Sequence, residues 1–360
     1  MSLRSSAATA PWVRPFAEAD IPSVAALHSR VFRPAMVDGG LEAYRRYFSE
    51  VFLAGGRGED GLPSLVCERD GRILGFLGVA ARRMVFRGGP IVMAICSQFA
   101  VEPAARGQVG LRLLKECFAG PQDLTISDEA QENTRAIWEW CGGDTVLPES
   151  LRWMRPLRPA QCGLTFLRRR APLSFVARTL GPAARVADSA LAAFGANGFA
   201  CRRPAGSRET VDAAAFAEVL RDLTAHCALR PEHGPRSAAW ALSRAGGRGG
   251  DSTARALLVR DDGGEPIGLT VHCVNNDRIA EVLLVAARPH ARGTVLDHLF
   301  DEAMRQGAVA AAGRLDRALM AAVASERMLM HSRNAQLRLA VHRGDVFLSR
   351  LEGEWCLRFR

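Results

Sequence analysis

Residues 101–110, Val-Glu-Pro-Ala-Ala-Arg-Gly-Gln-Val-Gly, combine residue types that together suit the binding of a phosphate group. An apolar run typical of a buried strand ends at Val101, and helical spacing of apolar residues begins near Gly107. Backbone N–H groups in such a strand-to-helix loop, together with the positive end of the helix dipole, form an anion site. Arg106 adds a fixed positive charge. The segment predicts a pyrophosphate site, and a turn that needs glycine only for its dihedral angles stays open as the alternative.

Carboxylates near strand ends are the residues that could act as a general base. Glu102, Asp128 and Glu129 lie there, where carboxylates of solvated loops and helix starts are also common. The only tyrosines, Tyr44 and Tyr47, share one predicted helix, and Tyr44 is kept as a further candidate without an assigned role. The catalytic residues therefore stay unknown, with Glu102, Asp128 and Tyr44 as candidates.

Strands and helices alternate around these residues in the first half of the chain. The expected strands are 13–16, 64–68, 73–81, 84–86, 91–101 and 124–127, and the expected helices are 21–31, 41–53, 107–119 and 134–141. Mixed strands with interleaved helices indicate an α+β or α/β sandwich.

A connecting segment rich in arginine, alanine and proline follows, with one or two amphipathic helices expected in it. It contains Arg168-Arg169-Arg170, which could contact a phosphate or simply form a solvated helix face. The remainder of the chain repeats the order of strands and helices expected in the first half. Its expected helices are 211–223 and 295–306, and its expected strands are 254–260, 266–274, 279–286, 345–351 and 354–359.

Matched spacing indicates that the second half is a duplicate of the first. Pro103-Ala-Ala-Arg-Gly107 recurs as Pro289-His-Ala-Arg-Gly293, and the register then continues without a gap through Val109 and Val295. Four such matches occur in the same order. They are Pro103/Pro289, Val109/Val295, Gly75/Gly268 and Asn133/Asn334. Ordered matches of this kind predict two copies of one domain.

Three motifs together resemble the GCN5-related N-acetyltransferase (GNAT) superfamily. They are the Arg-Gly-x-x-Gly turn at 106–110, the opening at 13–21 and the Asn-x-x-Ala-x-Trp-Glu-x-Cys-Gly-Gly element at 133–143. The resemblance implies an α/β (α+β) fold with two tandem acyl-CoA N-acyltransferase-like mixed-sheet domains. The resemblance is good over 11–158, the expected catalytic domain. It is weak over 209–360, the expected degenerate copy, and residues 159–208 are expected to connect the two.

The resemblance also implies where an acyl-CoA would bind. The implied residues are Phe99, Ala100, Val101, Arg106, Gly107, Gln108, Val109 and Gly110, with Asn133 beside the pantetheine arm. Two small positions of the family turn are occupied by Val109 and Leu111, and Gly110 is expected to compensate. The tyrosine that often protonates the leaving thiolate falls at Trp138, whose indole cannot supply a proton at neutral pH. In the second copy, Leu296 and Asp297 are expected to exclude a phosphate.

The expected function is an acyl-CoA-dependent N-acyltransferase, most simply an N-acetyltransferase that uses acetyl-CoA and no metal. The acceptor would be a small-molecule or peptide amine of unknown identity. Two alternatives stay open, a Fem-type aminoacyltransferase that uses aminoacyl-tRNA and a non-catalytic tandem GNAT-like binding protein. A salt-dependent response to tRNA would indicate the former.

Composition limits the partners and the location. The net charge of +9 comes almost wholly from arginine in an alanine-rich chain, which a coding bias explains without nucleic-acid binding. The nine cysteines are scattered and typical of small buried side chains in a reducing compartment. Without an expected signal peptide or membrane span, the predicted location is cytoplasmic, and homodimer formation stays open.

Overall fold

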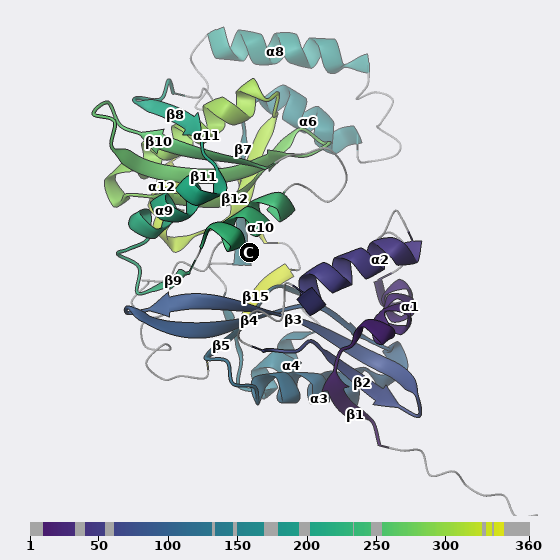
Figure 1. Cartoon of the computed structure of the whole chain (residues 1–360). Helices are drawn as coiled ribbons and strands as arrows, with labels where there is room; N and C mark the ends of the chain where they lie inside the picture. The colour runs from purple at the N-terminus through teal and green to yellow at the C-terminus, as the bar shows by residue number, and fades with distance from the viewer. Residues whose placement is uncertain are drawn as a thin grey trace, which may run out of the picture. The chain divides into compact units, whose positions relative to one another are not determined.

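The computed structural model describes residues 10–32, 40–54, 61–131, 134–146, 150–168, 179–193, 202–232, 234–245, 254–325, 329–332 and 335–341 (Figure 1). Two compact units are present, each built on one mixed β-sheet. Unit 1 comprises Met1–Leu147 and Asn334–Glu352, and unit 2 comprises Pro148–Arg333 and Gly353–Arg360. The functional division into 11–158, 159–208 and 209–360 stays a prediction.

The sheet of unit 1 has the strand order β1-β2-β3-β4-β5-β15-β6. Its strands are β1 (Trp12–Pro15), β2 (Leu65–Arg69), β3 (Arg72–Phe86), β4 (Gly89–Val101), β5 (Leu124–Gln131), β15 (Ala335–Val341) and β6 (Asp144–Val146). Strands β1 to β4 pair antiparallel, whereas β4 and β5 pair parallel. The strands expected at 73–81 and 84–86 are one continuous strand, because β3 pairs with β4 from Gly75 to Phe86.

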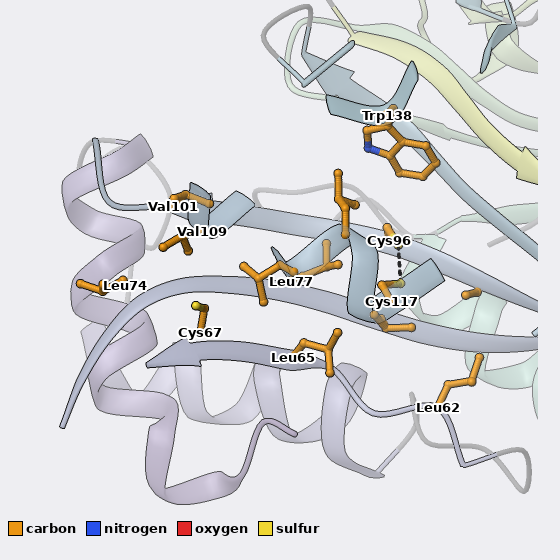
Figure 2. Close-up of a cluster of buried hydrophobic side chains, with 14 of the residues drawn as sticks. Leu62, Leu65, Cys67, Leu74, Leu77, Cys96, Val101, Val109, Cys117 and Trp138 are labelled. Carbon is orange, nitrogen blue, oxygen red and sulfur yellow. Dashed lines mark hydrogen bonds between the residues drawn. The ribbon is translucent and has the colours of Figure 1, made fainter. Parts of the chain in front are cut away.

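Helices cover both faces of this sheet. They are α1 (Ile21–Phe32), α2 (Gly40–Phe48), which continues as a π-helical turn (Ser49–Ala54), α3 (Arg106–Phe118) and α4 (Arg135–Trp140). Alternate residues of β2 divide between the two cores: Leu65 and Cys67 join the core of α3, whereas Val66 joins that of α1 and α2. Figure 2 shows the α3 core, where Cys96 and Cys117 lie with their sulfur atoms 3.7 Å apart.

The opening motif at 13–21 ties the first strand to its neighbours. The Arg14 guanidinium donates from Nη1 to Asp20 Oδ2 at 2.6 Å and from Nε to Glu68 Oε2 at 2.9 Å. Asp20 also accepts from the backbone N–H of Ala17 at 2.9 Å. Arg14 therefore joins β1, β2 and the start of α1 at one point.

The sheet of unit 2 has the order β14-β7-β13-β12-β11-β10-β8. Its strands are β8 (Ser207–Thr210), β10 (Arg255–Arg260), β11 (Pro266–Val274), β12 (Ile279–Ala287), β13 (Ala310–Arg314), β7 (Leu151–Pro156) and β14 (Leu329–Ser332). The remaining elements are α6 (Pro159–Arg168), α8 (Gly181–Ala193), α9 (Ala213–Leu223), the short strand β9 (Leu229–Pro231), α10 (Pro235–Ala245), α11 (Arg292–Arg305) and α12 (Met320–Ser325). Helices α6 and α8 fall where the connecting segment was expected to be helical. The strands expected at 345–351 and 354–359 lie outside the described residues.

The two sheets share one plan. In each, a helix crosses from the fourth strand to a parallel fifth: α3 between β4 and β5, and α11 between β12 and β13. Beyond the fifth strand, each sheet takes a strand from the other half of the chain. Strand β15 lies between β5 and β6, and β7 lies between β13 and β14. The prediction of two tandem mixed-sheet domains is confirmed, but not as two separate lengths of chain.

Candidate functional site

Strand β4 carries a bulge close to its carboxyl end. Ser97 pairs with Gly78 and Ala100 pairs with Phe76, so β4 has one more residue in this interval than β3. Gln98 takes a left-handed backbone conformation there, with φ of 53°. A non-glycine residue in this region of φ and ψ is uncommon and costs about 1–3 kcal/mol, so the surrounding structure must hold it in place.

Strand β4 also separates from β5 next to the bulge. The parallel pairing begins at Met93 with Leu124 and ends at Ile95 with Ile126. Beyond Ile95, within the described residues, the β5-facing backbone edge of β4 has no strand partner as far as Val101. An extended ligand with amide groups can therefore pair with this edge as an added strand would.

The predicted phosphate turn follows directly after this edge. A short 3-10 turn (Pro103–Ala105) leads into α3, which begins at Arg106 with no side-chain cap and no acidic residue in its first turn. Arg106, Gly107 and Gln108 are exposed. Arg106 makes no hydrogen bond or ion pair with any residue that the structure describes, so its charge is available to an anion beside the helix start.

The glycines of the turn differ in their surroundings. A Cβ added at Gly107 would meet no atom within 4 Å, whereas one at Gly110 would lie 3.3 Å from Phe99 Cζ and 3.5 Å from Ile137 Cδ1. Gly110 is therefore a packing glycine that lets α3 lie close to the strand. Its part in the binding of an acyl-CoA stays a prediction. Val109 is buried, 1% exposed, in that same core.

An aromatic cluster lies on the other face of the sheet, beneath the bulge. His28 of α1 is buried among Phe32, Phe48 and Phe76, with ring centroids 5.3–5.8 Å apart. Burial lowers the pKa of His28 to about 4, and a hydrogen bond to the backbone of Gln98 opposes that shift. The Gln98 side chain donates from Nε2 to Tyr47 Oη at 3.3 Å. The bulge is therefore held from α1 and α2, a support that the sequence did not indicate.

The candidate catalytic residues come from different elements of unit 1, and their roles stay a prediction. Glu102 Oε2 accepts hydrogen bonds from Arg30 at 3.0 Å and Arg72 at 3.4 Å. Burial raises the pKa of the Tyr44 hydroxyl, and its ring stacks on Phe48 at 5.7 Å. Asp128 belongs to β5, but its side chain, like that of Glu129, lies outside the described residues.

The element at 133–143 is present in part. Trp138 of α4 is 2% exposed and meets Phe118 edge-on at 5.1 Å, so it is a core residue of the α3 side. Asn133 lies outside the described residues, and its predicted place beside a pantetheine arm stays a prediction.

The corresponding region of unit 2 is filled by apolar side chains. Strand β12 also has a bulge, between its pairings of Leu284 with Val271 and Val282 with His272. No described residue in β12 has a positive φ. Leu296, which corresponds to Gly110, is 1% exposed and packs with Leu299 and Phe300 in the core beneath α11.

The described residues contain no group of three or more His, Cys, Asp and Glu side chains that could hold a metal ion. Within the same residues, every helix is too short or too polar to cross a membrane.

No family model matches the sequence, and no curated protein is similar to it in sequence. Solved structures are similar in fold. A probable N-acyltransferase of Enterococcus faecalis V583 has a TM-score of 0.57 at 12% identity and covers 94% of this chain and 74% of its own. GCN5-related N-acetyltransferases of Anabaena variabilis ATCC 29413 and Kribbella flavida have TM-scores of 0.59 and 0.56, at 12% and 15% identity. They cover 93% and 92% of this chain and 73% and 71% of their own. Over nearly its whole length, the chain therefore has the fold of GCN5-related N-acetyltransferases, which confirms the predicted resemblance.

Proposed function

We propose that unit 1 is an acyl-CoA-dependent N-acyltransferase, most simply one that transfers the acetyl group of acetyl-CoA to an amine. The observation that carries the proposal is the backbone edge of β4 between Ile95 and Val101, which faces away from β3 and has no strand partner. The start of α3, with the exposed Arg106, follows this edge directly. The amide-bearing arm and the pyrophosphate of one extended ligand would match these two features in order.

The reaction needs little from side chains. The amine nitrogen attacks the thioester carbonyl carbon, the carbon–sulfur bond breaks, and the proton lost by the amine balances the charge of the leaving thiolate. Backbone N–H groups at the bulge, fixed by Gln98 and its contacts with Tyr47 and His28, can polarise the thioester carbonyl. Holding the two reactants in register supplies much of the remaining acceleration.

Measurements of acetyl-CoA binding test whether the turn at the start of α3 binds the coenzyme. Arg106→Ala removes the positive charge, and Gly107→Asp places a carboxylate at the helix start, where a Cβ meets no other atom. We expect each change to weaken acetyl-CoA binding at least tenfold in isothermal titration, with the thermal midpoint nearly unchanged. Two variants that bind like the parent would show that the turn is assigned wrongly.

Arg292→Ala is the matched control, because Arg292 occupies the same place at the start of α11. The second copy has Leu296 and Asp297 where the first has Gly110 and Leu111, and these residues are expected to exclude a phosphate. We therefore expect one acetyl-CoA per chain and no effect of Arg292→Ala. A stoichiometry of two, or loss of binding in the Arg292 variant alone, would contradict this expectation.

Acyl transfer itself is measured by thiol release from acetyl-CoA with a panel of small-molecule and peptide amines. Binding without turnover on any amine would favour a non-catalytic binding protein. Binding of aminoacyl-tRNA with a steep salt dependence, and none of acetyl-CoA, would favour the Fem-type alternative.

A further inference from the structure

A cavity of about 350 Å³ lies in unit 2 between α6, α8 and the turn that joins β11 to β12. Figure 1 shows α6 and α8 as neighbouring helices of this unit. Arg168 of α6, Arg185 of α8 and Arg278 of the turn all line it. The volume falls within the range of small-molecule sites, and none of its residues belongs to the turn assigned to acetyl-CoA.

The Arg278 guanidinium is held in place by neutral groups. Its Nε donates to the backbone carbonyl of Gly307 at 2.8 Å, and its Nη1 donates to Gln161 Oε1 at 3.2 Å. No ion pair of Arg278 with a described carboxylate exists. The side chain is therefore fixed in direction while its charge stays uncompensated.

Further arginines add to this charge. Arg158 donates to the backbone carbonyls of Met304 at 3.1 Å and Ala308 at 3.4 Å, which are again neutral partners. Arg185 is exposed and makes no hydrogen bond or ion pair within the described part of the chain. Burial lowers the pKa of Arg278, and the charges of Arg158, Arg168 and Arg185 lower it further. Like charges repel one another, and an anion bound between these arginines would relieve the repulsion.

The rest of the lining is suited to an esterified anion. Gln161, Thr165 and Asn276 offer neutral hydrogen-bonding groups, and Leu164 offers an apolar surface. Asp277 is the single acidic residue of the lining, so positive charge predominates. A carboxylate would bring one negative charge to this cluster, whereas a phosphate group brings up to two and matches the guanidinium fork equally well.

We propose that this cavity is a binding site for a small phosphorylated anion, held by Arg185 and Arg278 with Arg168 at its rim. It also accounts for part of the triple arginine at 168–170, since Arg168 lines the cavity. Arg169 and Arg170 lie outside the described residues. The site stands independently of the acyltransferase proposal, because it uses residues of unit 2 alone.

Inorganic pyrophosphate and adenosine 5′-monophosphate, titrated calorimetrically into the full-length chain at low salt, test the proposal. We expect at least one of them to bind, and Arg185→Gln and Arg278→Gln each to weaken that binding tenfold or more. Tighter binding of the nucleotide would indicate a phosphorylated metabolite as the natural occupant, and tighter binding of pyrophosphate would indicate an inorganic anion. Either order supports the site if the two arginines are required.

Two controls separate this site from other cationic surfaces. Arg221→Gln removes the same charge from an exposed position of α9 outside the cavity and should bind like the parent. Arg106→Ala is the second comparison: loss of probe binding in that variant, with Arg185→Gln and Arg278→Gln binding like the parent, would assign the anion to the turn of α3 and overturn the proposal. Absence of binding by both probes, or unchanged binding in both Arg185→Gln and Arg278→Gln, would overturn the proposal.

Discussion

His28 of α1 supports the β4 bulge through a hydrogen bond to the backbone of Gln98. It lies 1% exposed beneath Gln98, and its Nε2 has no hydrogen-bond partner among the described residues. Because burial lowers its pKa from 6.5 to about 4, the folded state binds a proton less readily than the unfolded state. Stability from this group is therefore fully present above pH 6.5 and is lost as the pH falls from 6.5 towards 4.

We expect His28→Leu to make unfolding less sensitive to acid. In the parent, the His28 pKa shift lowers the free energy of unfolding by about 2 kcal/mol between pH 7.5 and pH 5. Leucine keeps the apolar volume and removes the titrating group. Urea unfolding at the two pH values should show a smaller acid-induced loss in His28→Leu than in the parent.

The exposed His226 provides the control, since His226→Asn should retain the full pH dependence of the parent. An equal acid-induced loss in His28→Leu and the parent would show that His28 titrates normally in the folded chain.

At the residue scale, sequence patterns predict which residue types stand in the candidate site but not which way their side chains point. Arg106 and Gly107 are exposed at a helix start, as their types and spacing indicate. For Gly110, spacing along a helix does not say whether a missing side chain faces a ligand or a strand, and the structure adds that a Cβ there would lie close to Phe99 and Ile137. The left-handed Gln98 carries no sequence signal, since glutamine has no preference for positive φ.

At the element scale, one contact between a helix and a strand recurs in both units. A Cβ at Gly75 of β3 would lie 2.6 Å from Val109 Cγ1 and 2.8 Å from Leu113 Cδ1 of α3. In unit 2, a Cβ at Gly268 would collide with Val295 in the same way. The valine of each crossover helix therefore fills the space that a glycine of the third strand leaves open, which gives the matched sequence positions a physical reason.

We expect Gly75→Ala to push α3 away from β3 and to destabilise unit 1 by about 1–3 kcal/mol, the usual cost of overpacking a core. Val109→Ala should lose about 1.5–3 kcal/mol through lost burial. The double variant should lose less stability than the sum of the two single losses, by at least about 0.5 kcal/mol. The reason is that alanine at position 109 leaves room for the new methyl group at position 75. Hydrogen exchange over β3 and α3 measures these free energies of opening.

Gly107→Ala controls for glycine replacement on the same helix. A Cβ there meets nothing within 4 Å, so this change should leave stability unchanged or raise it by up to about 1 kcal/mol. Strict additivity of Gly75→Ala and Val109→Ala would show that the two positions do not compete for space.

Element types were largely predictable because burial patterns follow local periodicity. The expected strand at 266–274 coincides with β11, and the helix expected at 107–119 is α3 within one residue at each end. Strands β7 and β15 were missed for a different reason. Their partners lie far away in the sequence, at Ala310–Arg314 and Leu124–Gln131, so pairing rather than local pattern defines them.

At the scale of the whole molecule, the chain completes each sheet with a strand from its other half. Strand β15 pairs with both β5 and β6 of unit 1, and β7 pairs with both β13 and β14 of unit 2. Neither sheet is complete without a segment that the linear ranges 11–158 and 209–360 assign elsewhere. A central strand of this kind contributes backbone hydrogen bonds along both edges, so its loss exposes two further strands.

Proline substitution in β15 and β7 tests whether each sheet takes one of its strands from the other half of the chain. Leu339 lies at a position of β15 that pairs with both Ile126 and Asp144, and Met154 pairs with both Ala312 and Leu329. Proline cannot donate to the ladder, so in a central strand it should cost about 3 kcal/mol or more. We expect Leu339→Pro to remove hydrogen-exchange protection from β5 and to spare β13, and Met154→Pro to do the reverse.

Two linear domains would give the opposite pattern, with Leu339→Pro opening the sheet of the second half and Met154→Pro that of the first. Leu339→Val and Met154→Leu keep the backbone donors and should leave protection in both sheets close to that of the parent.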